Sequence, residues 1–421
     1  MDTAVLRTEV HDQLAQIGQA DIVVGIPSYN SARTIGHVVR AVQAGLAKYF
    51  PEHRAVIVNS DGGSSDGTTG VVQRASIEDL NAILLHQRVE PAYKLTFPYS
   101  GIPGKGSAFR SVFEIARTLD AKACAVVDSD LRSITPEWIE LLVKPVLEGD
   151  FDYVSPLYHR HKFDGTITNS IVYPLTRALY GKRVRQPIGG DFGFSGKLAQ
   201  FYLTKDVWQS DVARFGIDIW MTTTALANGF KVAQSFLGAK IHDAKDPGAD
   251  LSDMLYQVVS ATFALMESYP EVWMPIRSSE PVPAFGFEYT VGLEHVNVNT
   301  ARMLHIFREG VRNLREVWLD VLGTGDLGEV ERLAGLDDAR FRFPAVLWAH
   351  VIYDYAIAFH RKRLPAEHLI KSLTPLYIGK TASFILEAEQ MGQQEAEAEI
   401  EKLCMEFENN KDYLTTNWKQ S

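Results

Sequence analysis

Two acidic residues follow directly on an apolar run in the first half of the chain. Residues 121–127 have the composition of a buried strand, and Asp128, Ser129 and Asp130 come immediately after it. Alternate residues of an extended segment face the same way, so the two carboxylates should lie together, and like charges at close range need a cation or donor between them. Carboxylate oxygens suit Mg²⁺ or Mn²⁺. These three residues therefore indicate a metal site that would bridge to a diphosphate.

A lysine between two glycines stands directly before a helical pattern. Gly104, Lys105 and Gly106 precede residues 107–119, where apolar residues recur every three or four positions. The N–H groups of a helix start and a lysine side chain both attract anions, so this segment indicates a phosphate-binding loop. It is not a Walker loop, because the upstream glycine is absent, and the Gly-Lys-Thr sequence at 379–381 fails the same test.

Small and acidic residues follow the first two apolar runs of the chain. Residues 20–26 and 54–59 have the pattern of strands, and short polar residues after a strand can bring N–H groups and carboxylates close to a polar ligand. An ordinary strand-to-helix turn is the alternative for either loop alone. The candidate ligand-binding residues of these two loops are Pro27, Ser28, Tyr29, Asn30, Ser60 and Asp61.

Strand and helix patterns alternate along the first 250 residues and give way to helical patterns afterwards. This alternation predicts an α/β fold with a parallel sheet covered by helices on both faces, and such sheets bind ligands beyond the carboxyl ends of their strands. The sequence thus predicts two domains, residues 1–250 and a mainly helical 251–421. Further strands are expected at 82–85, 153–157 and 231–236, and helices at 32–48, 167–180, 217–227, 251–268, 298–319, 344–360, 367–390 and 390–410.

The composition narrows the partners and the compartment. The chain has 421 residues and a formal net charge of −10, so it lacks the excess of Lys and Arg that a broad nucleic-acid surface requires. Its two cysteines lie far apart in sequence and indicate neither a zinc site nor a disulfide framework. The N-terminus is amphipathic and acidic where a signal peptide would be basic and apolar, and we see no span of membrane length. We expect a soluble, cytoplasmic protein with no membrane partner.

Taken in order, these segments resemble the GT-A nucleotide-sugar glycosyltransferases, and among them the retaining enzymes that make mannosylglycerate, glucosylglycerate and glucosyl-3-phosphoglycerate. The resemblance covers most of the chain and implies a Rossmann-like nucleotide-sugar-binding sheet and a UDP- or GDP-hexose donor. It also implies that the first two loops hold the nucleoside, that Lys105 contacts the nucleotide-sugar, and that Asp128, Asp130 and His242 hold Mg²⁺ or Mn²⁺. The residues implied to line the donor sugar and to serve catalysis are Gln186, Gly189, Asp191 (a glutamate in the family) and Asp218.

The acceptor region separates members of this family. Phosphoglycerate-using relatives carry an arginine next to a glycine, and here the corresponding glycine is followed by threonine. Mannosylglycerate synthases place an arginine four residues before an aspartate and a threonine four after it, a spacing that Arg160, Asp164 and Thr168 reproduce. The resemblance therefore implies D-glycerate as the acceptor, with Arg160 on its carboxylate and Thr168 beside its hydroxyls. The family arginine or asparagine that follows the metal-binding histidine is replaced here by Asp243, and Lys245 would compensate for it.

Retention of configuration needs either a covalent carboxylate intermediate or attack from the face of the leaving group. We favour the second, with a diphosphate oxygen taking the acceptor proton, because the resemblance implies no dedicated nucleophile. The product would be a glycosylglycerate compatible solute, and the C-terminal helices would wall the acceptor site and offer surface for a homodimer. Three alternatives stay open: transfer to 3-phosphoglycerate, an inverting transferase acting on a polysaccharide or lipid, and a nucleotidyltransferase or sugar-nucleotide-binding module.

Overall fold

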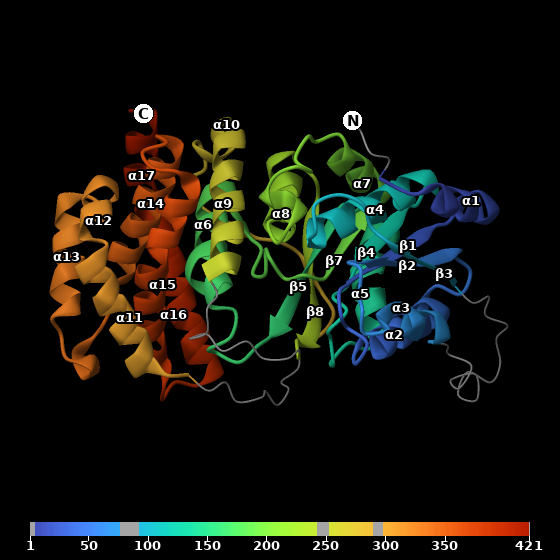
Figure 1. Cartoon of the computed structure of the whole chain (residues 1–421), viewed down its shortest axis with the longest axis horizontal. Coiled ribbons are helices and arrows are strands. Elements are labelled where there is room, and N and C mark those ends of the chain that lie inside the picture. Colours follow the sequence, from blue (N-terminus) through green and yellow to red (C-terminus); the bar gives the residue numbers. More distant parts are fainter. Residues whose placement is uncertain (1–4, 76–91, 242–251, 289–297, 421) are drawn as a thin grey trace. The chain divides into compact units, whose positions relative to one another are not determined.

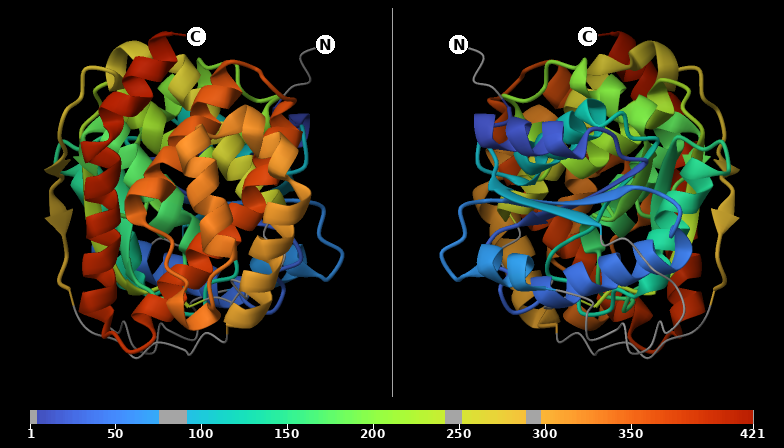
Figure 2. Two further views of the ribbon diagram at one scale, coloured as in Figure 1. Left: turned by 90° about the vertical axis from the view of Figure 1, so that its left-hand side faces the viewer. Right: turned by 90° about the vertical axis from the view of Figure 1, so that its right-hand side faces the viewer.

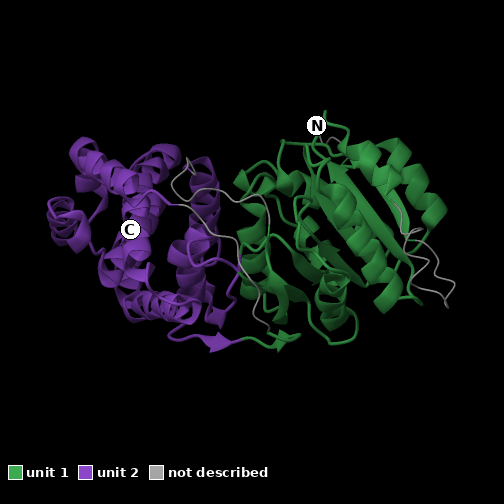
Figure 3. Ribbon diagram, turned by 90° about the horizontal axis from the view of Figure 1, so that it is seen from below, with its two compact units in different colours: residues 1–159, 188–243, 282–292 green, residues 160–187, 244–281, 293–421 purple. Residues whose placement is uncertain are grey.

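The computed structural model describes residues 5–75, 92–241, 252–288 and 298–420, which form two compact units (Figure 3). Unit 1 comprises residues 1–159, 188–243 and 282–292, and unit 2 comprises residues 160–187, 244–281 and 293–421. Each unit is discontinuous in sequence, whereas the sequence predicts a single boundary at residue 250. A catalytic first domain and an acceptor-binding second domain stay a prediction.

Unit 1 is built around a mixed sheet of eight strands in the order β10-β8-β5-β7-β4-β1-β2-β3. Its neighbours pair in parallel except at β7, which is antiparallel to both β4 and β5. The predicted α/β class is confirmed, and the predicted parallel pairing is wrong only at β7 among the described strands. The strands are β1 (Ile22–Ser28), β2 (Ala55–Asp61), β3 (Tyr93–Pro98), β4 (Ala123–Val126), β5 (Tyr153–His159), β7 (Phe192–Ser195), β8 (Val232–Ala239) and β10 (Ala284–Phe285).

Helices cover both faces of this sheet, with α2 and α3 on one face and α1 and α4 on the other (Figures 1 and 2). Ile22, Val24 and Ile26 alternate along β1 and share one hydrophobic core with residues of α2 and α5, as the two-residue period of a strand requires. On the other face a Cβ at Gly25 would lie 2.6 Å from a methyl of Val112 in α4, so the helix packs directly on the strand. The helices of unit 1 are α1 (Thr8–Ile17), α2 (Ile35–Tyr49), α3 (Thr68–Arg74), α4 (Lys105–Thr118), α5 (Pro136–Leu147), α7 (Gly196–Leu203) and α8 (Ile217–Ala227).

Unit 2 is mainly helical and contains a short parallel pair of strands, β6 (Lys182–Arg183) and β9 (Glu280–Pro281). A π-helix, η2 (Thr168–Val172), runs directly into α6 (Tyr173–Tyr180). No helix in the described ranges combines the length and the apolar character needed to cross a bilayer. The other helices are α9 (Ser252–Ser268), α10 (Pro270–Trp273), α11 (Thr300–Asn313), α12 (Arg315–Val321), α13 (Thr324–Ala334), α14 (Ala345–His360), α15 (Ala366–Ala388), α16 (Gln393–Asn409) and α17 (Lys411–Lys419).

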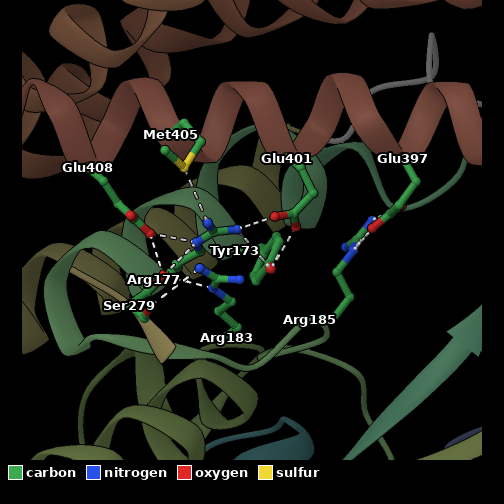
Figure 4. Close-up of polar contacts among 9 residues, drawn as sticks. All are labelled: Tyr173, Arg177, Arg183, Arg185, Ser279, Glu397, Glu401, Met405 and Glu408. Carbon is green, nitrogen blue, oxygen red and sulfur yellow. Dashed lines mark hydrogen bonds and ion pairs between the residues drawn. The ribbon is translucent and has the colours of Figure 1, made fainter. Parts of the chain in front are cut away.

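A buried arginine ties α6 to α16 within unit 2 (Figure 4). The side chain of Arg177 is only 1% exposed, and its guanidinium pairs with Glu401 and, through Nε at 2.6 Å, with Glu408. Arg185 forms a bidentate pair with Glu397 at 2.6 and 2.9 Å. These contacts hold the segment that leads to the predicted donor-sugar loop against one face of α16.

Most predicted elements correspond to observed ones, and the differences are local. The predicted strands at 20–26, 54–59, 121–127, 153–157 and 231–236 correspond to β1, β2, β4, β5 and β8. The predicted helix at 298–319 is interrupted at Leu314 and forms α11 and α12. The predicted strand at 82–85 lies outside the described residues, and the sequence analysis does not anticipate β3 or β7.

Candidate active site

Five charged side chains of unit 1 meet beyond the carboxyl end of β4. Lys105 Nζ lies 2.8 Å from Asp128 Oδ1 and 3.2 Å from Asp218 Oδ1. Lys240 Nζ lies 2.7 Å from Asp128 Oδ2 and 2.8 Å from Asp191 Oδ2. The charges thus alternate in the order Asp191, Lys240, Asp128, Lys105, Asp218, and we refer to these residues as the five-charge cluster.

Each member of the five-charge cluster comes from a different element. Lys105 is the first residue of α4, Asp128 follows β4, Asp191 directly precedes β7, Asp218 is the second residue of α8, and Lys240 directly follows β8. Four of the five are residues that the sequence analysis singles out. The structure therefore brings the predicted phosphate lysine, the first aspartate of the Asp-Ser-Asp motif and both predicted sugar-binding aspartates together.

Burial and mutual attraction set the charge states of the cluster. Burial alone would raise the pKa of Asp128, but Lys105 and Lys240 outweigh it and hold that pKa well below its usual range. Burial would lower the pKa of Lys105, but the charges of Asp128 and Asp218 hold it above its usual value. Burial raises the pKa of Asp191 and of Asp218, and the negative charge of Asp128 adds to both shifts. Of the three carboxyl groups, Asp128 is therefore held most strongly in its ionised form, whereas Asp191 and Asp218 take up a proton more readily.

The aspartate in the predicted donor-sugar loop is completely enclosed. Asp191 is 0% exposed, and its carboxylate accepts from Lys240, from the Tyr158 hydroxyl and, at 2.8 Å, from the backbone N–H of Asp128. The side chain of Asp218 is 14% exposed and pairs with Lys105. Of the two predicted sugar-binding carboxylates, Asp218 is thus the accessible one.

Two glycines bring the main chain over the cluster. The carbonyl of Gly189 accepts a hydrogen bond of 2.8 Å from Lys240 Nζ, so Gly189 contacts the cluster through its backbone. Gly190 has φ of +90°, and a Cβ there would lie 2.4 Å from Asp128 Oδ2 and 3.0 Å from Lys240 Nζ. A side chain does not fit at this position, so Gly190 is required both by its backbone conformation and by the charges beneath it.

The two predicted nucleoside loops are joined by hydrogen bonds. Ser28 Oγ donates to Asp61 Oδ1 at 2.8 Å, and Asn59 Nδ2 donates to Ser28 Oγ at 2.8 Å. The Asp61 carboxylate also accepts from the N–H groups of Gly63 and Ser64 at 2.9 and 2.7 Å, which closes the turn after β2. Asp61 therefore shapes the loop as well as being a candidate ligand.

The other predicted nucleoside-binding residues of these loops differ in their exposure to solvent. Tyr29 is 66% exposed and Asn30 is exposed, whereas Pro27 is half-buried and Ser60 is fully buried. The Ser129 hydroxyl lies 2.9 Å from the hydroxyl of Ser31 in the first loop. That contact connects the Asp-Ser-Asp motif with the predicted nucleoside loop. Asp130, the last residue of the motif, is exposed.

Other predicted site residues belong to unit 2 or lie outside the described residues. Arg160 pairs with Asp164 at 3.6 Å, as their spacing suggests, and Thr168, in the π-helix, is 4% exposed. Gln186 is also 4% exposed. His242 and Lys245 fall outside the described residues.

Two members of the site are missed by the sequence analysis. Lys240 is 8% exposed and joins two aspartates, and Tyr158 in β5 donates to Asp191. Lys240 carries a signal in the sequence, since a lysine directly after a buried strand needs a partner at the sheet edge. Tyr158 carries none, because a tyrosine in an apolar strand is ordinary.

The described residues contain no group of three or more His, Cys, Asp or Glu side chains placed to hold a metal. Each oxygen of Asp128 is within 2.8 Å of a lysine. The carboxylate chemistry of Asp128 and Asp130 suits a hard divalent cation. The predicted third ligand, His242, lies outside the described residues.

Comparison with known proteins gives one family and several distant relatives. The family model "Mannosylglycerate synthase, GT domain" matches residues 37–267, more than half of the chain. Mannosyl-3-phosphoglycerate synthase from Rubrobacter xylanophilus is 21% identical, with 61% of this chain and 78% of that chain covered and a TM-score of 0.46. Glucosyl-3-phosphoglycerate synthase from Mycobacterium tuberculosis, in complex with Mg²⁺ and UDP, is 19% identical, with 61% and 83% covered and a TM-score of 0.43. Glycosyltransferase AglD from Haloferax volcanii is 26% identical over 145 residues, 34% of this chain, and the match spans only 21% of that relative's length.

Proposed function

Since the chain belongs to the mannosylglycerate synthase glycosyltransferase family, we propose that it transfers a hexose, with retention of configuration, from a nucleoside diphosphate sugar to D-glycerate. The observation that supports this most directly is the five-charge cluster at the carboxyl edge of the sheet. It combines fixed cations for a departing diphosphate with carboxylates for a sugar, and it does so where α/β sheets bind their ligands.

Lys105 is the group we assign to the diphosphate. It opens α4, where the N–H groups of the first turn add positive potential. The flanking glycines are required by close packing, since a Cβ at Gly104 would lie 2.5 Å, and one at Gly106 1.9 Å, from backbone carbonyl oxygens of residues 212–213. This packing fixes the backbone at Lys105, and the ion pairs with Asp128 and Asp218 hold its ammonium. Electrostatic stabilisation of a leaving group is strongest when the charge is already in position.

The divalent cation would be held by Asp130 and His242, with Asp128 beside them. Asp130 is exposed and offers carboxylate oxygens, which fits a hard cation, whereas both oxygens of Asp128 already face lysines. When bound, Mg²⁺ or Mn²⁺ would act as a Lewis acid on the leaving diphosphate. Chelation with EDTA should therefore abolish turnover, and added Mn²⁺ should restore it.

The enclosure of Asp191 supports attack from the leaving-group face. Its carboxylate is 0% exposed and accepts from Lys240, Tyr158 and a backbone N–H, so it is not free to attack an anomeric carbon. We assign Asp191 to holding Lys240 and Asp128 in place, and the accessible Asp218 to the hexose hydroxyls. A sugar adduct trapped on either aspartate would contradict this assignment.

The basic residues near the predicted acceptor segment favour D-glycerate over 3-phosphoglycerate. Arg160 stands four residues before Asp164 and pairs with it at 3.6 Å, and it is the cation that we assign to the acceptor carboxylate. Lys162 is engaged elsewhere, because its Nζ donates to the carbonyls of Ala388, Glu389 and Met391 at 2.7 to 2.9 Å. A second cation for a phosphate is therefore not offered by Lys162.

The test is a matrix of UDP-glucose, GDP-glucose, ADP-glucose and GDP-mannose against D-glycerate and 3-phosphoglycerate, read as nucleoside diphosphate release with Mg²⁺ or Mn²⁺. Release that needs D-glycerate and gives an α-linked product is the expected result. Lys105→Met should lower the rate about a hundredfold or more, while Lys48→Met, an exposed lysine of α2, should leave it unchanged. Activity with 3-phosphoglycerate alone would mean that 3-phosphoglycerate, and not D-glycerate, is the acceptor. A β-linked product, or no nucleoside diphosphate release at all, would overturn the proposal.

A further inference from the structure

Unit 2 contains a cavity of about 180 Å³ whose lining includes none of the residues assigned to the proposed transfer. Its wall comes from the start of the π-helix segment, from the residues that lead into α14, and from α15 and α16. It is lined by three basic, two acidic, four neutral polar and six apolar residues, so its lining carries a net charge of +1 with all groups ionised. A cavity of this size is below that of most drug-sized sites and admits a ligand of about one ring.

Lys380 places a buried cation in this wall. The side chain belongs to α15, where the Gly-Lys-Thr sequence at 379–381 is helical and not a loop. Lys380 is 8% exposed, and its Nζ donates to the carbonyl of Phe343 at 3.0 Å. Within the described parts of the chain no carboxylate lies within 4.0 Å of this ammonium, so two of its N–H groups have no protein acceptor there. Burial lowers the pKa of Lys380, which is the expected consequence of that poor compensation.

The other polar groups of the wall already have partners. Lys402 Nζ pairs with Glu399 at 2.6 Å. Glu387 accepts from a serine hydroxyl one turn earlier in α15, and Thr166 Oγ1 lies 2.5 Å from the Tyr377 hydroxyl. Arg342, the third cation of the lining, is exposed and donates to the carbonyls of Ala339 and Phe341. Lys380 is therefore the buried cation of the cavity that can still donate to a ligand.

We propose that this cavity binds a small organic carboxylate with an apolar ring or chain, the carboxylate on Lys380 and the apolar part against Phe343, Phe384 and Leu403. A carboxylate supplies the acceptors that Lys380 lacks, and a buried charge pair of this kind needs good hydrogen bonds to form. Phe343, Phe384 and Leu403 favour an apolar ring or chain over a strongly hydroxylated ligand, since hydroxyls placed against these side chains would lose their hydrogen-bond partners. Glycerate is therefore not the ligand we assign here.

The experiment uses benzoate and benzamide as a matched pair of probes, which have a similar shape but differ in charge, since benzoate is an anion and benzamide is neutral. Titration calorimetry and thermal melting are carried out on the full chain without donor or acceptor, so the result does not depend on turnover. We expect benzoate to bind and to raise the melting temperature, and benzamide to do neither. Lys380→Met should weaken benzoate binding about tenfold or more. Lys371→Met is the control, because it removes an exposed lysine of the same helix that pairs with Glu367.

A second variant keeps the test decisive if Lys380→Met does not fold. Ala345→Phe adds a ring to the lining while Lys380 remains, and it should abolish benzoate binding. Equal binding of benzoate and benzamide, full benzoate binding by both variants, or no binding to the wild type would overturn the proposal. So would displacement of benzoate by D-glycerate at equal concentration, since that would make the cavity a site for the hydroxylated acceptor.

Discussion

Replacing Gly190 by alanine should disable the five-charge cluster and leave unit 1 folded. The residue has φ of +90°, and the added methyl would lie 2.4 Å from Asp128 Oδ2 and 3.0 Å from Lys240 Nζ. Ordinary contacts of a Cβ begin at 3.4 Å, so the Asp128 carboxylate must retreat by about 1 Å. Because Asp128 holds both lysines of the cluster, the displacement is passed on to Lys105 and Lys240.

The variant carries two separable effects. A left-handed backbone conformation costs an alanine about 1–2 kcal/mol of folding free energy relative to glycine. The displaced carboxylate adds a loss of rate, since misplacement of a catalytic arrangement by about 1 Å lowers turnover about a hundredfold. We therefore expect a modest loss of stability and a large loss of activity.

Gly229→Ala is the matched control. Gly229 lies in the same unit with φ of +72°, and a Cβ there would meet nothing within 4 Å. This variant should carry the same backbone cost and retain nearly full activity. The free energy of unfolding in urea and the rate of nucleoside diphosphate release should be measured for both. If Gly190→Ala keeps a rate within about threefold of Gly229→Ala, the geometry of the cluster is not needed for transfer, and the assignment fails.

Three further outcomes are expected. Lys240→Met should lower the free energy of unfolding by about 3–5 kcal/mol at neutral pH, because Asp191 is left buried without its cation. That loss should shrink at acid pH, where Asp191, whose pKa is already raised by burial, takes up a proton. A loss that does not depend on pH would contradict this prediction. In urea unfolding, Glu408→Gln should lower the free energy of unfolding by about 2–3 kcal/mol, because the side chain of Glu408 is only 12% exposed where it pairs with Arg177. Glu401→Gln should lower it by about 1 kcal/mol or less, because the side chain of Glu401 is 40% exposed. Equal losses would be evidence against a special role of the buried Arg177–Glu408 pair. Burial lowers the pKa of Lys411 to about 7, although three backbone carbonyls accept hydrogen bonds from it, so above that pH the unfolded state binds more protons than the folded state. The free energy of unfolding of the wild type, relative to Lys411→Met, should therefore rise from about pH 7 to 10 with a slope of at most about 1.4 kcal/mol per pH unit. A wild-type advantage that falls over this range would refute the prediction.

The sheet could be predicted wherever a strand was long and apolar. β1, β2 and β8 have seven or eight residues, nearly all buried, and such strands stand out from their surroundings. β7 has four residues, and its Gly193 is required because a Cβ would lie 1.9 Å from the carbonyl of Leu142 in α5. A strand of this length leaves no periodic signal in the sequence, and its glycine is required only by contact with a helix that lies far away in sequence. That one strand also reverses direction, and this accounts for the incorrect prediction of a parallel sheet.

The site could be predicted to the extent that its residues end strands or begin helices. Lys105 and Asp128 do so, and topology alone brings them to one edge. Tyr158 acts through its hydroxyl from within β5, and only the fold shows that it reaches Asp191. The sequence shows that residue 190 is a glycine but not why a glycine is required there. The requirement comes from the carboxylate of Asp128, which lies next to it in the fold and 62 positions earlier in sequence.

The balance of charge in the cluster predicts that a nucleoside diphosphate sugar and a divalent cation bind together. Two lysines face three aspartates, so the fully ionised cluster carries one net negative charge. A nucleoside diphosphate brings further negative charge. Lys105 alone does not neutralise this charge, because its ammonium already pairs with Asp128 and Asp218. Protonation of Asp218, whose pKa burial raises, would relieve one charge, and a divalent cation near Asp130 would relieve two. Affinity for the donor should therefore rise when Mg²⁺ or Mn²⁺ is added and, without metal, when the pH is lowered; donor binding that is indifferent to both would mean that the cluster does not face the diphosphate.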